Sequence, residues 1–343
     1  SVGLATGIIS QAVTLGGQGG NGAAGGVAQA SSTGSVNTIG PASLGVLAQS
    51  IGGNGGMAGL SIAGLSADKA LNSRYNFILG NSLTTDPITT VITAGSGENG
   101  GKATASISGS VATYGALSYG VVAESIGGGG GKGGSASVSS SAGTSSDDGT
   151  TNTASPNDSS DATSAQSKSG VSVAASLGGK GGAGGGANTV NVKSTAPVTT
   201  IGNNSTAIFA QSVGGGGGAG GYNITAGVIG AVGIGGTGGD GGNGGKVWVN
   251  NSQTIHTLEQ VSAGIYAMSV GGGGGSGGGS FSTAVGGPIT NASMATAVGG
   301  TGGSGGVGGS VGVNCASSSN VGNSTACTNA PAMATLGRSA VIS

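Results

Sequence analysis

One motif returns four times along this chain, and it constrains the fold more than any other sequence feature. Each copy is a short stretch of alternating side chains that ends in an Ala-x-Ser triplet and runs, one residue later, into a block of glycines. The first copy reads LGVLAQSI before GGNGG, and the last reads AGIYAMSV before GGGGGSGG. Alternation with period two is typical of β-strands. A strand motif that recurs at intervals of dozens of residues predicts a repeat architecture.

A second motif alternates with the first. It consists of Gly-Gly-X triplets that lead into another alternating stretch, as in GGTGGDGGNGG before KVWVN. From that stretch to the serine of the next first-type motif, the four distances are 22 to 25 residues. The remainder of each module is long after Ser50 and Ser125 but short after the last two copies. A constant coil with variable excursions predicts a β-solenoid that carries its insertions on one side.

The strand pattern divides each first-type motif into two faces. One face carries the alanine and the serine and hardly changes between copies, so we expect it to pack closely against an opposing layer. The other face varies more and is expected nearer to solvent. Stacked coils would place like residues in register, about 4.8 Å apart. The predicted repeat core is Ala48, Ser50, Ala123, Ser125, Ala210, Ser212, Ala267 and Ser269.

Glycine makes up 84 of the 343 residues, and its blocks have two competing explanations. They are either flexible linkers or extended helices with three residues per turn, dimensionally similar to polyproline II. In the second case the X residues line up on one side, and the glycine faces pack against neighbouring helices. The triplet phase of GGTGGDGGNGG favours the helices, whereas the pure GGGGG runs do not decide.

These patterns predict an all-β fold, a repetitive elongated β-solenoid with polyglycine-II-like segments and loop excursions. We expect residues 1–343 to form one array of about four modules, cut from a longer secreted chain. One coil per few dozen residues would give a stack on the order of 50–80 Å long. Segment 68–93, rich in large side chains, is expected to form a helix or hairpin excursion, and the acidic, Ser-rich segment 139–169 a mobile loop. The last six residues, 338–343, align with 205–210, which predicts a further strand in the same register.

The two cysteines, Cys315 and Cys327, lie in the one coil that is about ten residues too long. We expect a disulfide that closes the insertion 315–327 and keeps the coil in register. Closing so short a loop would stabilise the fold by about 3 kcal/mol and would require an oxidising compartment. Two unpaired thiols are the alternative.

The composition argues against most chemistry. Nine basic residues scattered along the chain are too few for a nucleic-acid interface, and large side chains are too few to fill the thick core of an enzyme. Lys132 follows five glycines, but Gly133 stands where a phosphate loop needs Ser or Thr. His256 is the only histidine, and the aspartates of 147–161 lack a calcium-binding repeat. The sequence therefore predicts no enzyme and no catalytic, cofactor-binding or metal-binding residues.

The succession of an alternating strand, Ala-Gln-Ser-Ile/Val and five glycines resembles the glycine-rich repeats in passenger regions of bacterial autotransporter (type V secreted) adhesins. The matching residues are 46–56, 121–134, 208–221 and 265–278. The resemblance implies a Gram-negative cell-surface protein with a β-solenoid passenger. It also implies an outer-membrane barrel that lies outside the sequence given.

The leading functional hypothesis is a structural or adhesive segment of an extracellular fibre or stalk, with a role in biofilm as one setting. Its partners would be copies of itself in a filament or stacked array, adjoining repeats, or a ligand on a host surface or in a matrix, and no nucleic acid. One alternative is a receptor-binding tip on a bundle of polyglycine helices, similar to phage tail-fibre adhesins. A smaller one is ice binding by flat, Thr-rich faces.

Overall fold

The computed structural model describes residues 2–6, 13–66, 88–90, 93–141, 173–286, 292–315, 332–334 and 340–342. Within these residues the chain forms strands and extended segments and contains no helix. The strands are arranged in five sheets. The expected all-β class is therefore confirmed.

The chain repeats a unit of five strands, which we call a pass. The first pass contains β3 (Ala28–Ser32), β4 (Val36–Ile39), β5 (Leu44–Ile51), β6 (Ser61–Ser66) and β7 (Ile88–Thr90). The second contains β8 (Ala103–Ile107), β9 (Val111–Tyr114), β10 (Tyr119–Ile126), β11 (Ala136–Ser141) and β12 (Val173–Leu177). The third contains β13 (Val190–Ser194), β14 (Val198–Ile201), β15 (Ile208–Val213), β16 (Asn223–Gly227) and β17 (Gly230–Ile234).

The fourth pass contains β18 (Val247–Asn251), β19 (Ile255–Leu258), β20 (Ile265–Val270), β21 (Ser280–Ala284) and β22 (Met294–Val298). Before the first pass come β1 (Val2–Thr6) and β2 (Val13–Leu15). After the fourth come β23 (Val311–Cys315), β24 (Ala332–Ala334) and β25 (Ala340–Ile342).

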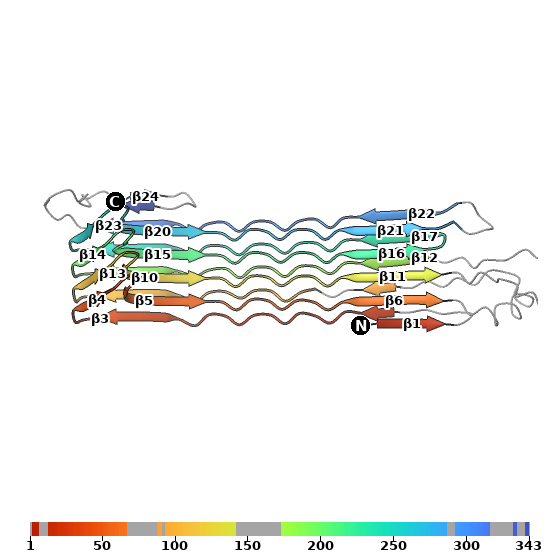
Figure 1. The fold of residues 1–343 in the computed structure, drawn as a ribbon, viewed down its shortest axis with the longest axis horizontal. Helices are drawn as coiled ribbons and strands as arrows, with labels where there is room; N and C mark the ends of the chain where they lie inside the picture. The colour runs from red at the N-terminus through yellow and green to blue at the C-terminus, as the bar shows by residue number, and fades with distance from the viewer. Residues whose placement is uncertain are drawn as a thin grey trace, which may run out of the picture.

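Strands that are five apart in chain order lie side by side in each sheet, as in β1-β6-β11-β16-β21. From β1 to β23 all these pairs are parallel. Figure 1 shows the passes lying one above another, with the N-terminal strands at the bottom and β22 near the top. The register places like residues opposite one another in columns, namely Ala48, Ala123, Ala210 and Ala267, and Ser50, Ser125, Ser212 and Ser269.

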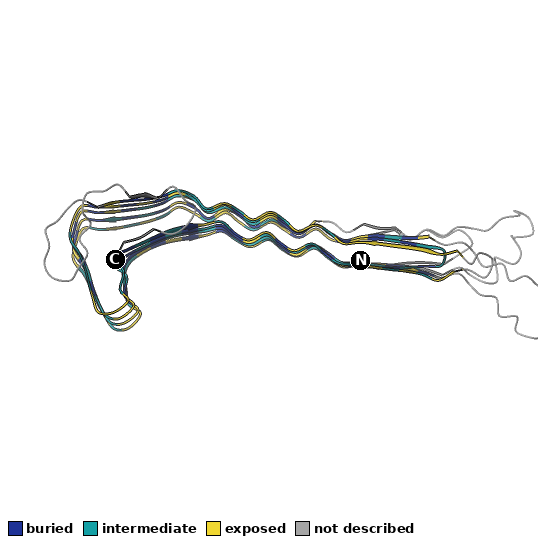
Figure 2. Cartoon of the chain, turned by 90° about the horizontal axis from the view of Figure 1, so that it is seen from above, coloured by how far each residue is buried: buried dark blue, intermediate teal, exposed yellow. Residues whose placement is uncertain are grey.

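Two glycine-rich arms join the strands of each pass. The outward arms connect the first three strands of a pass to the fourth and span nine residues each, 52–60, 127–135, 214–222 and 271–279. The return arms lead back and span twelve residues each, 16–27, 178–189, 235–246 and 299–310, while 93–102 is the described part of another. Both lengths are multiples of three. Figure 2 shows the two arms as long wavy layers that run side by side and meet at one end in a three-sided turn.

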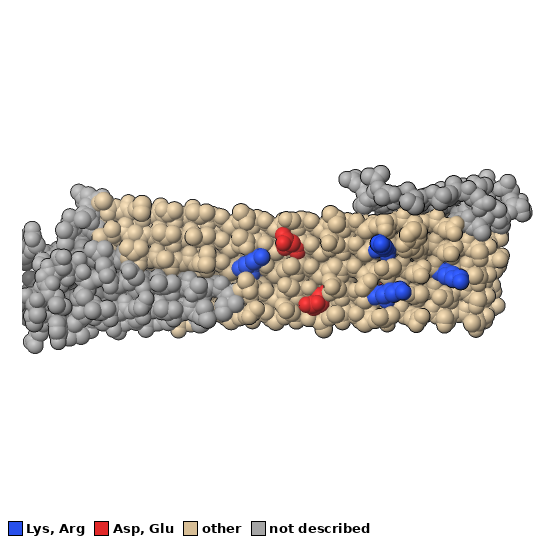
Figure 3. All heavy atoms as spheres, turned by 180° about the vertical axis from the view of Figure 1, so that it is seen from behind, with Lys and Arg blue, Asp and Glu red and all other residues tan. Residues whose placement is uncertain are grey.

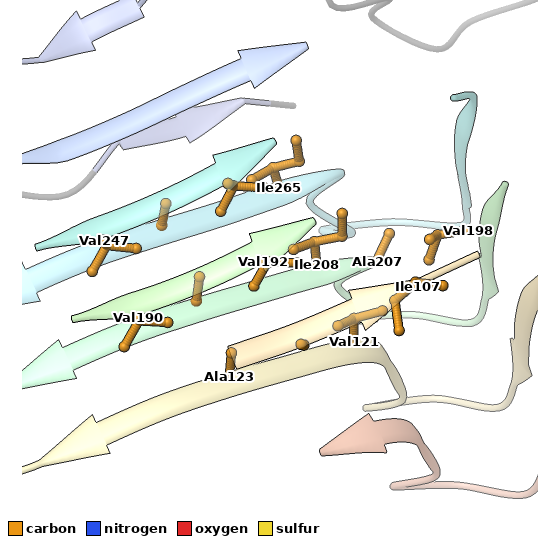
Figure 4. Packing of buried hydrophobic residues seen from close by; sticks show 14 of the residues in the cluster. Ile107, Val121, Ala123, Val190, Val192, Val198, Ala207, Ile208, Val247 and Ile265 are labelled. Carbon is orange, nitrogen blue, oxygen red and sulfur yellow. The ribbon is translucent and has the colours of Figure 1, made fainter. Parts of the chain in front are cut away.

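The main hydrophobic core fills that three-sided turn. Figure 4 shows side chains from the β8-β13-β18 and β10-β15-β20 sheets facing one another across it. The largest fully buried residues are Ile208 and Ile265, and most of the remaining core is valine and alanine. At the far end of the arms the buried apolar cluster contains only Ala63, Val138 and Ala174. Small side chains thus keep the two layers thin along the whole molecule.

The stack is shorter than the sequence predicts. Like positions in successive passes are 75, 87, 57 and 64 residues apart, because one pass contains both repeated motifs and both arms. Four or five passes spaced about 4.8 Å apart reach only about 20–25 Å along the stack. The expected 50–80 Å along this direction is therefore wrong, and the longest dimension of the molecule lies along the arms (Figure 1).

The constant part of each pass is more regular than the motif spacing suggests. In all four passes, 22 residues separate the first residue of the first strand from the serine of the Ser50 column. In the third pass these two residues are Val190 and Ser212. The variation in length lies between the fourth and fifth strands, in connections of 21, 31, 2 and 9 residues at 67–87, 142–172, 228–229 and 285–293. The strands that flank all four connections belong to the same two sheets, at the same end of the arms.

The two expected excursions fall largely outside the described residues. Of segment 68–93, the structure describes β7 and residue 93, and β7 pairs with β2 and β12. Of segment 139–169, residues 139–141 belong to β11, so the strand extends three residues into the expected loop.

The last described strands differ from the expected register. β24 and β25 pair antiparallel to β23 and β20, with Ala340 opposite Ala267. The alignment of 338–343 with 205–210 predicts a parallel strand, and that prediction is wrong. An edge strand presents unpaired N–H and C=O groups that a neighbour of either direction can bond.

Candidate functional site: the stacking interface

The eight residues of the predicted repeat core are all buried, with at most 4% of any of them exposed. The alanines face the main core, whereas the serines lie where the strands continue into the outward arms. Of the varied positions on the opposite face, Leu47 and Gln49 are exposed, but Val122 is buried. The alternation of small and varied positions therefore predicts burial well, with Val122 as an exception.

Three serines of this column, Ser50, Ser212 and Ser269, each join two successive return arms through the hydroxyl. The Ser212 hydroxyl donates to the carbonyl of Asn188 (3.0 Å) and accepts from the N–H of Gly245 (2.7 Å). Ser269 repeats the arrangement with the carbonyl of Gly245 (2.7 Å) and the N–H of Gly309 (2.7 Å). A hydroxyl both donates and accepts, so one small side chain satisfies two backbone groups that belong to different passes. We call these contacts the serine clasp.

The first pass carries the same clasp, and in the second pass Ser125 makes the bond to the following return arm. Ser50 donates to the carbonyl of Gly26 (2.6 Å) and accepts from the N–H of Gly101 (2.8 Å), and Ser125 accepts from the N–H of Asn188 (2.8 Å). The clasp explains why serine occupies this position in every copy of the motif. Alanine would fit the space but would leave the arm donors without a partner.

The arms are held by backbone hydrogen bonds in two directions. The N–H of Gly130 donates to Gly216 in the same arm of the next pass (2.8 Å), and that of Gly131 donates to Gly95 in the other arm (2.9 Å). The same alternation continues along both arms in all described passes. The glycine blocks are therefore ordered layers rather than loose linkers.

Most arm glycines are required by these close approaches. A Cβ on Gly182 would lie 1.9 Å from the carbonyl oxygen of Gly95, and one on Gly239 would lie 1.9 Å from that of Gly182. Backbone atoms on both sides leave no flexible group that could move away. By contrast, a Cβ on Gly273 would have nothing within 4 Å. Gly273 occupies an X position, where the third residue of each triplet faces outward.

Outward-facing asparagines and one aspartate supply a third set of contacts. The Oδ1 atom of Asn54 accepts from the N–H of Gly129 (2.7 Å), that of Asn99 from Gly186 (2.6 Å), and that of Asp240 from Ser304 (2.8 Å). In each case the acceptor belongs to one pass and the donor to the next. The backbone pairs only two of the three N–H groups in a triplet, so a short side chain with an oxygen satisfies the third. Sequence reasoning missed this role, although Asn and Asp at X positions are its visible signal.

A second serine column holds the corners between the second and third strands of each pass. The hydroxyl of Ser205 accepts from the N–H of Ser118 (3.2 Å) and donates to the carbonyl of Gly115 (3.0 Å). Ser262 makes the equivalent bonds to Ser205 (3.1 Å) and Gly202 (2.9 Å). The corners are thus locked to one another by the same device as the arms.

The residues that could act as ligands or acid–base groups are dispersed over the described part of the chain. Among them there is no group of three or more His, Cys, Asp or Glu that could hold a metal ion. His256 lies on β19 opposite Thr199, at the surface of the turn. Lys132 lies with its amino group 5.5 Å from the ring centre of Tyr222, which is a cation–π distance. No helix within the described ranges is long and apolar enough to cross a membrane.

The expected disulfide remains a prediction. Cys315 ends β23, with its backbone opposite Asn251, and Cys327 lies outside the described residues.

Comparison with known proteins adds no further assignment. No family model, no curated protein and no solved structure matches this chain.

Proposed function

We propose that this chain is a β-solenoid segment with polyglycine-II-like arms, and that it serves as a structural or adhesive part of an extracellular bacterial surface fibre. One observation carries the proposal: from β1 to β23, strands five apart pair in parallel register in every sheet, so each pass provides the template for the next. Architectures of this kind grow by addition of repeats and hold together through nearest-neighbour contacts.

The contacts of the arms support the polyglycine-II description. Arm lengths are multiples of three, the outward side chain recurs every third residue, and hydrogen bonds run both along the stack and across the two layers. The resulting body is a flat blade that is two layers thick. Such a body offers extended surfaces along its stacked passes, which favours a structural role.

The proposed location at the bacterial cell surface rests on the resemblance to autotransporter passenger repeats. In this proposal the outer membrane is reached through a barrel outside the sequence given, and catalysis and cofactors play no part. An antibody against this segment, applied to intact cells, tests the location. Labelling of surface extensions supports the proposal, and labelling found only inside permeabilised cells contradicts it.

Assembly with copies of itself or with adjoining repeats would use the first pass, where β3, β4 and β5 are edge strands of their sheets. The N–H of Gly52 donates to Ile126 in the second pass (2.8 Å). Because bonding direction alternates along a parallel strand, the N–H of Gln49 points to the open side. Gln49→Pro therefore removes a donor at the edge without breaking a backbone hydrogen bond inside the chain.

We expect the purified chain to form concentration-dependent stacked species in sedimentation velocity and negative-stain images, and Gln49→Pro to shorten them. Gln49→Ala is the matched control, since it also loses the side-chain bond to Glu124 (2.6 Å) but keeps the backbone donor. A chain that stays monomeric at all concentrations would rule out self-assembly and leave adjoining repeats as the partner.

A receptor-binding tip is the second candidate, and one observation favours it. The connections of variable length all start and end at strands of the same two sheets, at one end of the blade. Binding residues are commonly carried by loops that a rigid scaffold positions. Shortening the connections 67–87 and 142–172 to two residues, as between β16 and β17, should abolish attachment to target cells if this candidate is correct. Unchanged attachment would exclude it.

A further inference from the structure

The only tryptophan of the chain lies exposed on a sheet surface in a defined arrangement. Trp248 belongs to β18, whose alternate residues Val247, Val249 and Asn251 are buried, so its side chain faces outward and is 45% exposed. Its register partner on the next strand is Gly312. A Cβ on Gly312 would lie 2.2 Å and 2.4 Å from two atoms of the six-membered ring. The indole therefore rests over Gly312, close against the sheet.

Cationic and amide side chains surround this ring on the same outer face. Lys246 precedes Trp248 by two residues, and Asn250 follows by two. On the preceding strand, Asn191 is the register partner of Trp248, and Lys193 is the partner of Asn250. From strand geometry the Cα atoms of both lysines lie about 7–8 Å from that of Trp248. Long lysine side chains span that distance, so their amino groups reach a ligand placed on the indole.

The charge on this part of the face has one sign. The outward residues of the five strands β3, β8, β13, β18 and β23 include no acidic side chain among the described residues. Lys102 occupies the same column as Lys246, two passes away. Figure 3 shows basic side chains gathered over this end of the face, with the acidic side chains nearer to the middle of the blade. An anionic ligand is therefore favoured.

We infer that Trp248, Lys246 and Lys193, with Asn191 and Asn250, form a binding platform for an acidic polysaccharide, a chain of uronic acid residues. The C–H face of a sugar ring stacks on an exposed indole, as apolar groups do on aromatic faces. Lysines hydrogen-bond carboxylates with charge assistance, and amides bond sugar hydroxyls. A flat, open platform without a pocket suits a long chain better than a small molecule. The inference does not depend on the fibre role, because an isolated chain would bind as well.

The single tryptophan makes the test direct, since intrinsic fluorescence reports on this site alone. Titration of the intact chain with alginate oligomers at low salt should give a saturable change in emission that weakens as salt is raised. Dextran, a neutral glucan, should bind more weakly and without the salt dependence. No change in emission with alginate at any concentration would overturn the inference.

Single substitutions distinguish specific binding at the platform from non-specific adsorption of the protein. On immobilised alginate, Trp248→Ala should lose affinity about tenfold, the scale of one aromatic stacking contact. Phe281→Ala, which removes an exposed aromatic on another sheet, should bind as the parent does. Lys193→Gln should weaken alginate but not dextran binding, whereas Lys132→Gln, which alters the outward arm, should change neither.

Two outcomes would contradict the assignment. Equal losses in Trp248→Ala and Phe281→Ala would show non-specific adhesion. Tighter binding of a DNA duplex than of alginate, with the same quenching of Trp248, would mean that the face recognises phosphate rather than uronic acid. Circular dichroism of each variant confirms that the strands are retained.

Discussion

At the scale of single residues, the glycines of this protein are of two kinds. Those inside the arms are required because a Cβ would overlap the backbone of a neighbouring pass, as at Gly182 and Gly239. Those at outward positions, such as Gly216 and Gly273, meet no such limit. Glycine loses more backbone entropy on folding than other residues, so the second kind weakens the fold.

Alanine substitutions separate the two kinds. Gly239→Ala should destabilise the chain by about 3 kcal/mol or more, because its Cβ would lie 1.9 Å from the carbonyl oxygen of Gly182. Gly273→Ala, in the outward arm of the next pass, should be neutral or stabilising by about 0.5 kcal/mol. Urea unfolding followed by circular dichroism measures both. Equal effects would contradict the packing of the arms.

The serine clasp gives a second prediction at this scale. Ser212→Ala leaves the N–H of Gly245 and the carbonyl of Asn188 without their side-chain partner. Leaving buried polar groups unpaired should lower the free energy of unfolding by about 1–3 kcal/mol. Ser276→Ala, at an exposed outward position, should change it by less than about 0.5 kcal/mol. The clasp is refuted if amide exchange at Gly245 is no faster in Ser212→Ala.

At the scale of elements, the turn between the second and third strands has the same backbone conformation in all four passes. The four turns differ in how well their residues tolerate that conformation. The first turn residue has a positive φ in every pass, +127°, +136° and +148° at Gly40, Gly115 and Gly202, but +88° at Glu259. Two residues later the chain is again left-handed, at +55° for Asn204 and +56° for Val261. A β-branched residue is poorly suited to this conformation, whereas Asn tolerates it. The fourth corner is therefore the most strained of the four.

Exchanging these residues tests the strain. Val261→Asn should stabilise the chain by about 1 kcal/mol, since Val261 is exposed and contributes little packing. Asn204→Val, the reverse change one pass earlier, should destabilise it by a similar amount. The midpoint of thermal unfolding reports on both, and opposite signs are the decisive result. If both variants shift the midpoint in the same direction, side-chain packing rather than backbone strain governs the corner.

Sequence reasoning finds the parts of this fold that local pattern determines. Period-two alternation locates the strands around Ala210 and Ser212, and their repetition gives the register. The four-residue strands such as β14 are not predicted by this pattern, because V-T-T-I is too short to show a period. The hydrogen-bond partners of Asn54 and Asn99 are not predicted either. These bonds join residues 75 and 87 apart in the chain, so they depend on the length and path of the whole pass.

At the scale of the whole molecule, the stack behaves as a one-dimensional array with a constant frame and a variable end. The arms and the three-sided turn keep their lengths, and the connections between fourth and fifth strands absorb all differences. Each pass contacts mainly the pass before and the pass after it. Stability should then be a sum of pass and interface terms, and removal of one complete pass should leave a folded molecule.

Deletion of residues 190–246 tests this prediction. It removes 57 residues, the interval that separates Val190 from its register partner Val247, and joins the return arm 178–189 to β18 in phase. We expect a cooperatively folded chain whose long dimension in small-angle scattering is unchanged and whose stack is shorter by about 4.8 Å.

Deletion of 190–245 is the matched control, because it removes nearly the same mass but shifts the phase by one residue. A shift of one residue turns every inward side chain of the following strand outward. In that variant Lys246 would enter the inward column of Val190 and Trp248 that of Val192, while Val247 would face outward. We expect it to unfold or aggregate. If the two deletions behave alike, passes are not independent units, and the contacts that hold the molecule together must extend beyond neighbouring passes.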